Sequence, residues 1–286
     1  MAERINKAIE LLEQDQPVYY ASTHEVDYET GRAMAGTWAD YINVSMEHGA
    51  FDMPGLAAFM RGLADAGPTA SGHRTPAVIV DLPPEGTSAA DIRANAWVFK
   101  QALARGVHGI LLCHAEDPEA VRALVQVCRY AFRGATGGAP EGRRGAGGQG
   151  MAAHAWGVDV DEYARRADLW PLNPEGELMI GLKIENRRAL ERVDETLALP
   201  GVAFAEWGPG DMHMSFGHMA ADRSYPAEIV EARRRVFDAC RRNGLPFLDG
   251  TGDLVERIDA GVRIIPGAGE EQARVGRAHT GRTMPV

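Results

Sequence analysis

Short apolar segments alternate along this chain with longer amphipathic stretches, and this alternation restricts the folds that the chain can adopt. Each apolar segment has the length of a buried strand and is too short for a helix. The eight predicted strands span residues 18–22, 41–45, 77–82, 109–113, 178–184, 203–207, 246–248 and 262–265. Strands separated by helices pair in parallel, because each helix carries the chain back to the same edge of the sheet. Eight consecutive units of this kind predict a closed (β/α)8 barrel.

An open, doubly wound parallel sheet is the alternative arrangement of the same elements. Such a sheet often carries a glycine-rich phosphate loop after its first strand, and none follows residues 18–22. The predicted helices span residues 53–66, 89–105, 118–130, 159–168, 187–197 and 227–243. A length of 286 residues suits one barrel, and no internal repeat is visible. We therefore predict a single domain, 1–286, with an added N-terminal helix and a partly helical segment at 270–286.

The composition excludes several classes of partner. The chain has 30 basic and 40 acidic residues, and its formal net charge of −10 disfavours nucleic acid and anionic membranes as partners. Its three cysteines, Cys113, Cys128 and Cys240, form neither a disulfide framework nor a zinc motif, so we expect a cytoplasmic protein. No apolar stretch approaches the ~18 residues of a membrane span, and the N-terminus is charged throughout.

One segment interrupts the alternation of strands and helices. Residues 133–150 read RGATGGAPEGRRGAGGQG, which is too rich in glycine for a regular helix or strand. Long loops in compact domains are usually either functional or disordered. We expect this loop to take part in the choice of substrate.

Two carboxylates that close predicted strands are the first candidates for a functional site. Glu185 follows residues 178–184, and Asp211 follows the strand at 203–207. In a parallel barrel the side chains at the carboxyl ends of the strands point into one mouth. Paired carboxylates with open coordination positions suit a hard divalent cation such as Mg²⁺ or Mn²⁺. The alternative is that both are ordinary solvated acids.

Histidines follow three of the predicted strands. His48 comes just after the strand at 41–45 and beside Glu47, which could orient it. Its imidazole titrates near neutral pH and would make a good general base, although it could instead be a surface histidine in a loop. His24 and His114 follow the first and fourth predicted strands, where each could contact substrate or be structural.

Three short segments carry a resemblance to a known family. Residues 47–49, 183–185 and 208–212 read Glu-His-Gly, Lys-Ile-Glu and Gly-Pro-Gly-Asp-Met. Together they resemble the motifs of the HpcH/HpaI-type class II pyruvate aldolases, and the likeness spans most of the chain. The resemblance implies a (β/α)8 barrel in a homo-oligomer (a dimer, trimer or hexamer), with the last helix exchanged between subunits.

The resemblance also implies an activity. A metal-dependent aldolase of this family would cleave or form a 4-hydroxy-2-oxo acid, with pyruvate (or an analogue such as hydroxypyruvate) and an aldehyde as the other reactants. A divalent cation (Mg²⁺, Mn²⁺ or Co²⁺) would be held by Glu185 and Asp211. His48 would take the proton of the C4 hydroxyl, and Pro209 and Gly210 would lie against the substrate.

Three positions depart from the family pattern. Asp81 stands where the family has an arginine that binds the oxo acid, and Lys183 stands where it has a glutamine. The aspartate that pairs with the catalytic histidine is missing at 103–106. Lys183 shares a strand face with Glu185, because side chains two residues apart lie on one face, so its ammonium could stabilise the enolate. The alternative is a structural ion pair between Lys183 and Asp81.

The remaining alternatives concern one further arginine and the reaction class. Arg144, followed by Gly145, resembles an Arg-Gly pair of the family and would reach the substrate, or else be a solvated loop residue. A Schiff base on Lys183 is disfavoured, because an ammonium beside a carboxylate stays protonated. A barrel of this kind has three alternative functions: another metal-dependent lyase, a hydrolase of an oxo acid, or a non-catalytic homologue.

Overall fold

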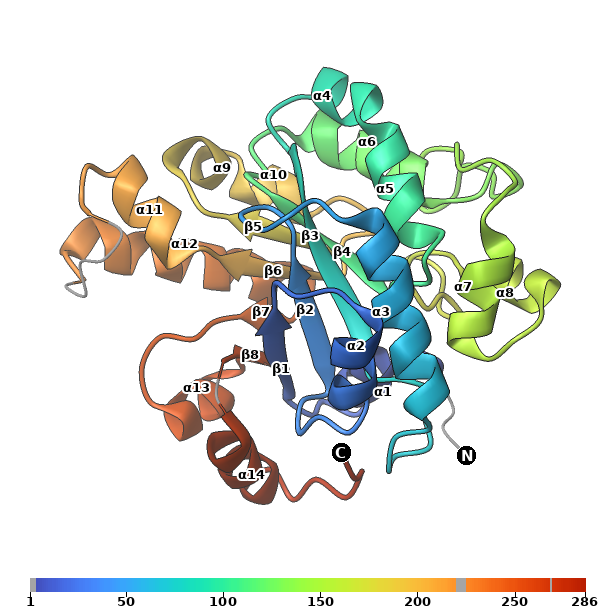
Figure 1. Ribbon diagram of the computed structural model, residues 1–286. Coiled ribbons are helices and arrows are strands. Elements are labelled where there is room, and N and C mark those ends of the chain that lie inside the picture. The colour runs from blue at the N-terminus through green and yellow to red at the C-terminus, as the bar shows by residue number, and fades with distance from the viewer. Residues whose placement is uncertain (1–3, 220–224, 268) are drawn as a thin grey trace.

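The computed structural model describes residues 4–219, 225–267 and 269–286, and its centre is a closed barrel of parallel strands in chain order (Figure 1). The strands are β1 (Val18–Thr23), β2 (Tyr41–Ser45), β3 (Ala77–Glu85), β4 (Gly109–Cys113), β5 (Met179–Ile184), β6 (Phe204–Trp207), β7 (Phe247–Leu248) and β8 (Ile264–Pro266). Strand β8 pairs with β1 and closes the ring. The prediction of a (β/α)8 barrel is therefore confirmed, and every predicted strand has its counterpart.

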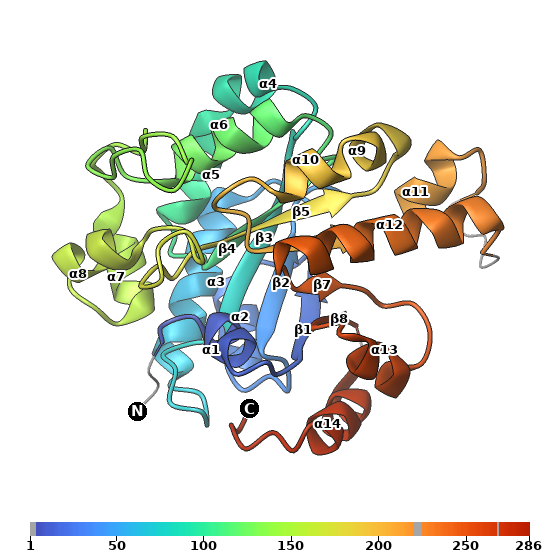
Figure 2. The ribbon, with the colours of Figure 1, turned by 180° about the vertical axis from the view of Figure 1, so that it is seen from behind.

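Helices surround this barrel, as Figures 1 and 2 show from opposite sides. They are α1 (Lys7–Glu13), α2 (Tyr28–Met34), α3 (Met53–Ala66), α4 (Ala89–Ala94), α5 (Ala96–Leu103), α6 (Pro118–Cys128), α7 (Gln149–Trp156), α8 (Val160–Arg166), α9 (Arg187–Glu191), α10 (Val193–Leu197), α11 (Pro209–Ser215), α12 (Ala227–Asn243), α13 (Leu254–Ala260) and α14 (Gly269–His279). None of those described is both long and apolar enough to cross a membrane.

Most of the helix predictions are confirmed, with two differences. The stretches predicted at 89–105 and 187–197 each divide into two short helices, because Asn95 and Arg192 leave the helical conformation, with ψ near 13° and 12°. Four helices were not predicted: α2, α7, α11 and α13. Each is only seven or eight residues long, which is too short for a clear helical period.

The core has two layers, because successive side chains of a strand point to opposite faces. Tyr41 packs inside the barrel, whereas Ile42 and Val44 pack between the barrel and its helices. Gly181 shows how tightly the inner layer is filled, since a Cβ at this position would lie 2.1 Å from the ring of Phe204. The barrel interior is therefore a packed core and not a channel.

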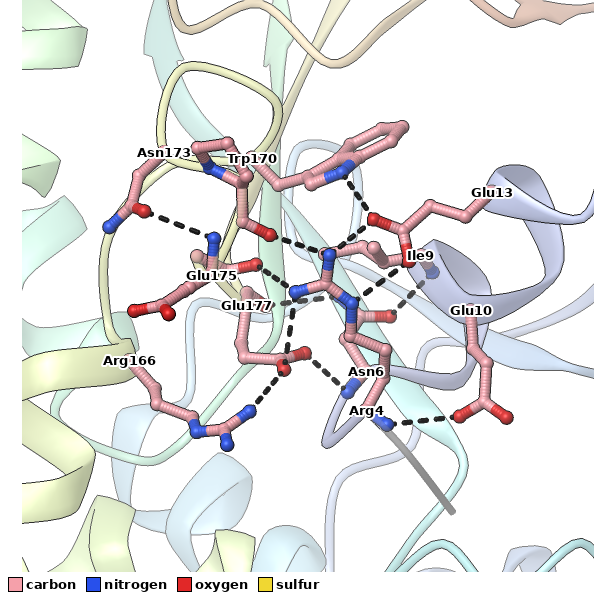
Figure 3. A network of polar contacts seen from close by, with 12 residues as sticks. Arg4, Asn6, Ile9, Glu10, Glu13, Arg166, Trp170, Asn173, Glu175 and Glu177 are labelled. Atoms are coloured by element: carbon pink, nitrogen blue, oxygen red, sulfur yellow. Dashed lines mark hydrogen bonds and ion pairs between the residues drawn. The ribbon is translucent and has the colours of Figure 1, made fainter.

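Helix α1 closes the amino end of the barrel, and polar contacts attach it there (Figure 3). Asn6 caps the helix through its side chain, while its backbone N–H donates to the buried carboxylate of Glu177 at 2.9 Å. Arg166 donates to the same carboxylate at 3.2 Å, and Arg4 lies 3.6 Å from it. The predicted N-terminal helix is thus a plug for one end of the barrel.

The C-terminal helix packs on the outside of its own barrel. Arg277 of α14 donates to the backbone oxygen of Trp38 at 2.6 Å, and Arg282 beyond the helix pairs with Asp40 at 2.6 Å. The expected helix at 270–286 is confirmed as far as His279. Its exchange between subunits stays a prediction.

Candidate active site

The carboxyl ends of β2, β4, β5 and β6 bring a group of polar side chains together inside the barrel mouth. Lys183 and Glu185 share one face of β5, and Lys183 is the register partner of Glu206 on β6. Glu47 follows β2, and Cys113 ends β4. These positions form a polar layer directly above the apolar inner core.

Lys183 is bound to Glu47 in this layer. Its ammonium lies 2.6 Å from Glu47 Oε2, and both side chains are largely buried. Burial by itself lowers the pKa of Lys183, but the surrounding acidic groups (Cys113, Glu206, Glu185 and Glu47) raise it above its usual range. Lys183 therefore stays protonated at neutral pH. A protonated amine is not a nucleophile, so the structure disfavours a Schiff base.

The alternative ion pair between Lys183 and Asp81 is wrong. Asp81 is buried and accepts hydrogen bonds from Asn43 Nδ2 at 3.1 Å and from the backbone N–H of Met46 at 2.9 Å. The N–H of Glu47 also points to it, at 3.3 Å. Asp81 thus holds the turn after β2 in place and positions Glu47, because the two oxygens of its carboxylate are already used by these donors.

Glu185 is a buried carboxylate with one oxygen left for a ligand. Oε1 accepts the backbone N–H of His114 at 2.8 Å, and no described residue donates to Oε2. Oε2 lies against Gly208, where an added Cβ would approach it to 2.6 Å. Burial raises the pKa of Glu185. A cation beside Oε2 would compensate for this loss of solvation.

Asp211 lies in the first turn of α11, three residues after Gly208. Its side chain is partly exposed, and no described residue forms a hydrogen bond or an ion pair with its carboxylate. Both predicted metal ligands thus flank the backbone at Gly208 and have uncommitted oxygens. Carboxylate oxygens of this kind are the ligands that Mg²⁺ and Mn²⁺ prefer, so the residues present fit a hard divalent cation. Pro209 and Gly210 start the same helix at the surface of the mouth.

A second grouping of possible ligand atoms joins Glu185 to Glu47 and Cys113, all within 4.8 Å of one another. Cys113 is buried, and burial raises the pKa of its thiol far above the ordinary value. It is nevertheless adjacent to both carboxylates. Asp211 lies outside this group, so the mouth has a deep acidic pair and a shallower carboxylate on α11.

The sequence reasoning missed Glu206. Burial, followed by the nearby charges of Glu185, Asp81 and Glu47, raises its pKa to about 8, although Lys183 opposes this shift. Two signals could have revealed it. It interrupts an apolar strand, and it lies two residues after Phe204, so both side chains face the barrel interior.

His48 and His24 lie at the rim of the mouth. His48 Nε2 is 3.6 Å from Glu47 Oε2, the same oxygen that Lys183 binds, and its side chain is 71% exposed. Glu47 is therefore placed between the predicted base and the buried ammonium. His24 is exposed, with Nδ1 3.3 Å from the backbone oxygen of Ser45.

His114 is deeper than the other two histidines. Its Nδ1 lies 3.6 Å from Glu185 Oε1, and its Nε2 lies 3.9 Å from Glu47 Oε1 and 3.9 Å from Glu85 Oε1. The sequence leaves open whether His114 contacts substrate or is structural, and the structure places it among three carboxylates of the mouth.

Arg144 is the predicted residue that the structure places elsewhere. It is buried, donates to the hydroxyl of Tyr163 at 2.8 Å and lies over the ring of Tyr130 at 4.5 Å. Tyr163 in turn donates to the backbone oxygen of Leu103, at the end of α5. The segment 133–148 lies between α6 and α7, within the connection that runs from α6 to β5, so it belongs to the side where strands begin. A loop between a helix and the next strand runs at the amino end of a barrel, away from the mouth.

Comparison with known proteins agrees with this geometry. The family model described as HpcH/HpaI aldolase/citrate lyase matches residues 34–261. The chain belongs to this family. The resemblance drawn from residues 47–49, 183–185 and 208–212 is therefore confirmed.

Among relatives, the hydroxypyruvate/pyruvate aldolases of Roseobacter denitrificans and Deinococcus radiodurans are 30% and 29% identical to the chain over 60% and 75% of its length. The matched segments span 61% and 66% of these relatives' own lengths.

Among solved structures, an HpcH/HpaI aldolase/citrate lyase family protein from Burkholderia cenocepacia covers 96% of this chain and 97% of its own, with a TM-score of 0.71 and 22% identity. The citrate lyase beta subunit from M. tuberculosis, complexed with oxaloacetate and magnesium, covers 92% and 96%, with a TM-score of 0.54 and 16% identity. At these identities the two structures support the fold alone.

Proposed function

We propose that this protein is a divalent-metal-dependent aldolase that cleaves a 4-hydroxy-2-oxo acid into an aldehyde and pyruvate, or a pyruvate analogue such as hydroxypyruvate. The observation that carries the proposal is the buried Glu185, which has an uncommitted oxygen beside the backbone that leads to Asp211. The aldolase relatives at about 30% identity support the same reaction class.

Glu185 and Asp211 would hold the cation (Mg²⁺, Mn²⁺ or Co²⁺). Its chemistry is that of a Lewis acid, which stabilises negative charge on the oxygens of a 2-oxo acid. The M. tuberculosis citrate lyase beta subunit, which shares the fold, is complexed with magnesium and oxaloacetate, and we propose ligands of the same classes, a divalent cation and an oxo acid, for this chain.

The chain's own residues supply the rest of the reaction. His48 takes the proton of the C4 hydroxyl as the C3–C4 bond breaks, and the electron pair of that bond moves into the enolate of the oxo acid. Glu47 contacts both His48 and Lys183 through Oε2, so it fixes the position of the base relative to the buried ammonium. The ammonium of Lys183 contributes the positive charge that steadies the anionic substrate in this acidic mouth.

A turnover assay tests this proposal. Purified protein is incubated with pyruvate or hydroxypyruvate and several aldehydes, with Mn²⁺ or with EDTA. We expect turnover with Mn²⁺ that EDTA removes, and neither turnover nor Mn²⁺ binding in Asp211→Asn. Turnover that persists unchanged in EDTA contradicts the proposed role of the cation, whereas Mn²⁺ binding without any aldol or retro-aldol turnover favours a different metal-dependent reaction.

The proposal keeps two further predictions from the sequence. A homo-oligomer and a cytoplasmic location are both compatible with the acidic composition of the chain. Size-exclusion chromatography with light scattering measures the first, and a monomer at micromolar concentration would contradict it.

A further inference from the structure

His114 has a backbone conformation that is unusual for its residue type. Its φ of +46° is left-handed, and Asp15 is the one other non-glycine residue in the described ranges with a positive φ. Side chains other than glycine avoid this region, and such strain persists where the surroundings hold it, often at functional sites. Here the conformation aims the His114 N–H at Glu185 Oε1, at 2.8 Å.

The contacts of Asn186 fix the position of the proton on the His114 ring. The amide oxygen of Asn186 accepts the backbone N–H of Ala189 at 2.9 Å, and a backbone N–H can only donate. The other end of the amide is therefore NH₂, which donates to Glu116 Oε1 at 2.9 Å and faces His114 Nδ1 at 3.2 Å. Nδ1 must accept, so a neutral His114 carries its proton on Nε2.

This Nε2–H points into the mouth and has no protein acceptor within hydrogen-bond distance. The oxygens of Glu47 and Glu85 lie 3.9 Å away, and the described residues offer nothing nearer. The side chain of His114 is 23% exposed, so a ligand can reach it. Lys183 in the same polar layer already donates to Glu47, and the amide of Asn43 donates to Asp81.

We propose that His114 is a catalytic residue that donates its Nε2–H to the substrate oxygen on which charge develops. This inference rests on the proposed aldolase function. When the C3–C4 bond breaks, the electron pair moves into the oxo acid and negative charge grows on its C2 oxygen. A preorganised donor stabilises this charge without giving up its proton. Asn186 is the positioning residue that keeps the donor on the correct nitrogen.

Two variants test this assignment from different directions. His114→Gly removes the imidazole but keeps the N–H to Glu185 and suits a positive φ. Asn186→Asp keeps the helix-capping acceptor for Ala189 but replaces the donor to Nδ1 by an acceptor, which draws the proton to Nδ1. We expect either change to lower kcat by roughly a hundredfold. Mn²⁺ affinity, measured by isothermal titration, should change by no more than about threefold, because each variant retains Glu185 and its N–H donor.

A matched control lies at the closed end of the barrel. Asn173 also accepts a backbone N–H through its amide oxygen, at 3.0 Å from Glu175, and donates to a carboxylate, at 3.2 Å from Asp168. Asn173→Asp makes the same chemical change far from the mouth and should leave kcat unchanged. Two-bond ¹⁵N–¹H correlation spectra report the tautomer independently of turnover: we expect Nε2–H in the wild type and Nδ1–H in Asn186→Asp.

The outcomes separate this inference from the function on which it rests. Wild-type turnover that survives His114→Gly within about twofold would overturn the role of His114 alone. A wild-type ring protonated on Nδ1 would do the same. Absence of aldol turnover in the wild type with every cation would overturn the proposed function and, with it, the role of His114.

Discussion

The two ends of the barrel contain buried acids in opposite electrostatic settings. At the closed end, Asp40 is fully buried but contacts three cations: Arg282 at 2.6 Å, Arg277 at 3.3 Å and Lys7 at 3.4 Å. Burial alone would raise the pKa of Asp40, and these cations nevertheless hold it below its usual value. Figure 3 shows Glu177, a second buried acid of this end, which arginines contact from two sides. Burial still raises the pKa of Glu177, because these contacts only partly offset the loss of solvation.

At the open end, four acids surround one cation. Glu47, Asp81, Glu185 and Glu206 face the mouth, and Lys183 is the ammonium among them. Burial raises the pKa values of Glu185 and Glu206, whereas Lys183 holds the pKa of Glu47 below its usual value despite burial. The two ends therefore differ in their counter-charges: three cations contact Asp40 at the closed end, whereas one ammonium lies among four acids in the mouth.

The largest expected effect comes from removing the deepest acid of the mouth. Glu185→Gln should abolish Mn²⁺ binding and detectable turnover, because the amide cannot supply an anionic ligand. Glu177→Gln is the matched change at the closed end, and it should lower thermal stability but leave kcat per folded molecule unchanged. Titration calorimetry and the turnover assay measure both. Equal losses of activity in the two variants would remove the distinction between the ends.

The next prediction tests His48 as the general base at the rim of the mouth. His48→Ala should lower kcat about a hundredfold or more while Mn²⁺ still binds, because His48 is a proton acceptor and not a ligand in this scheme. His279→Ala changes an outer histidine that pairs with Asp259 at 2.7 Å, and it serves as the control. Loss of Mn²⁺ binding in His48→Ala would contradict the assignment.

A stability measurement tests the closed end itself. Asp40→Asn leaves Lys7, Arg277 and Arg282 without their common carboxylate, and we expect the free energy of unfolding to fall by about 3–5 kcal/mol. Asp259→Asn removes a surface pair with His279 and should cost no more than about 1 kcal/mol. Urea denaturation followed by circular dichroism provides the comparison. Similar small losses in both variants would show that Asp40 is not a structural centre.

The last test concerns pH and the open end. The pKa of Glu206 is raised from 4.5 to about 8, so the folded state holds a proton that the unfolded state releases between these values. Stability of the metal-free protein should therefore fall as pH rises through this window, by up to about 1.4 kcal/mol per pH unit.

Glu206→Gln should flatten this dependence, because the amide does not titrate. Urea denaturation in EDTA at several pH values between 5 and 9 compares the wild type with Glu206→Gln and with Glu195→Gln, a surface change. Parallel curves for the wild type and Glu206→Gln would show that Glu206 titrates normally.

The sequence by itself determined the barrel and the outline of the site. Strand number and strand ends follow from local apolar patterns, so Glu185, Asp211, His48 and His114 could all be assigned to the carboxyl ends of strands or to the segments just after them. The family motifs then indicated which of these positions resemble ligands and which resembles a base. This succeeded because each inference depends on residues close together in the chain.

Only the tertiary structure decided which side chains meet. Lys183 binds Glu47 and not Asp81, because the donors of Asn43 and of the turn after β2 already occupy Asp81. Glu206 joins the site through its register with Lys183, and Arg144 leaves it because its loop runs at the amino end. Register between strands, the reach of long side chains and the tautomer of His114 all depend on contacts between distant segments, which no local pattern encodes.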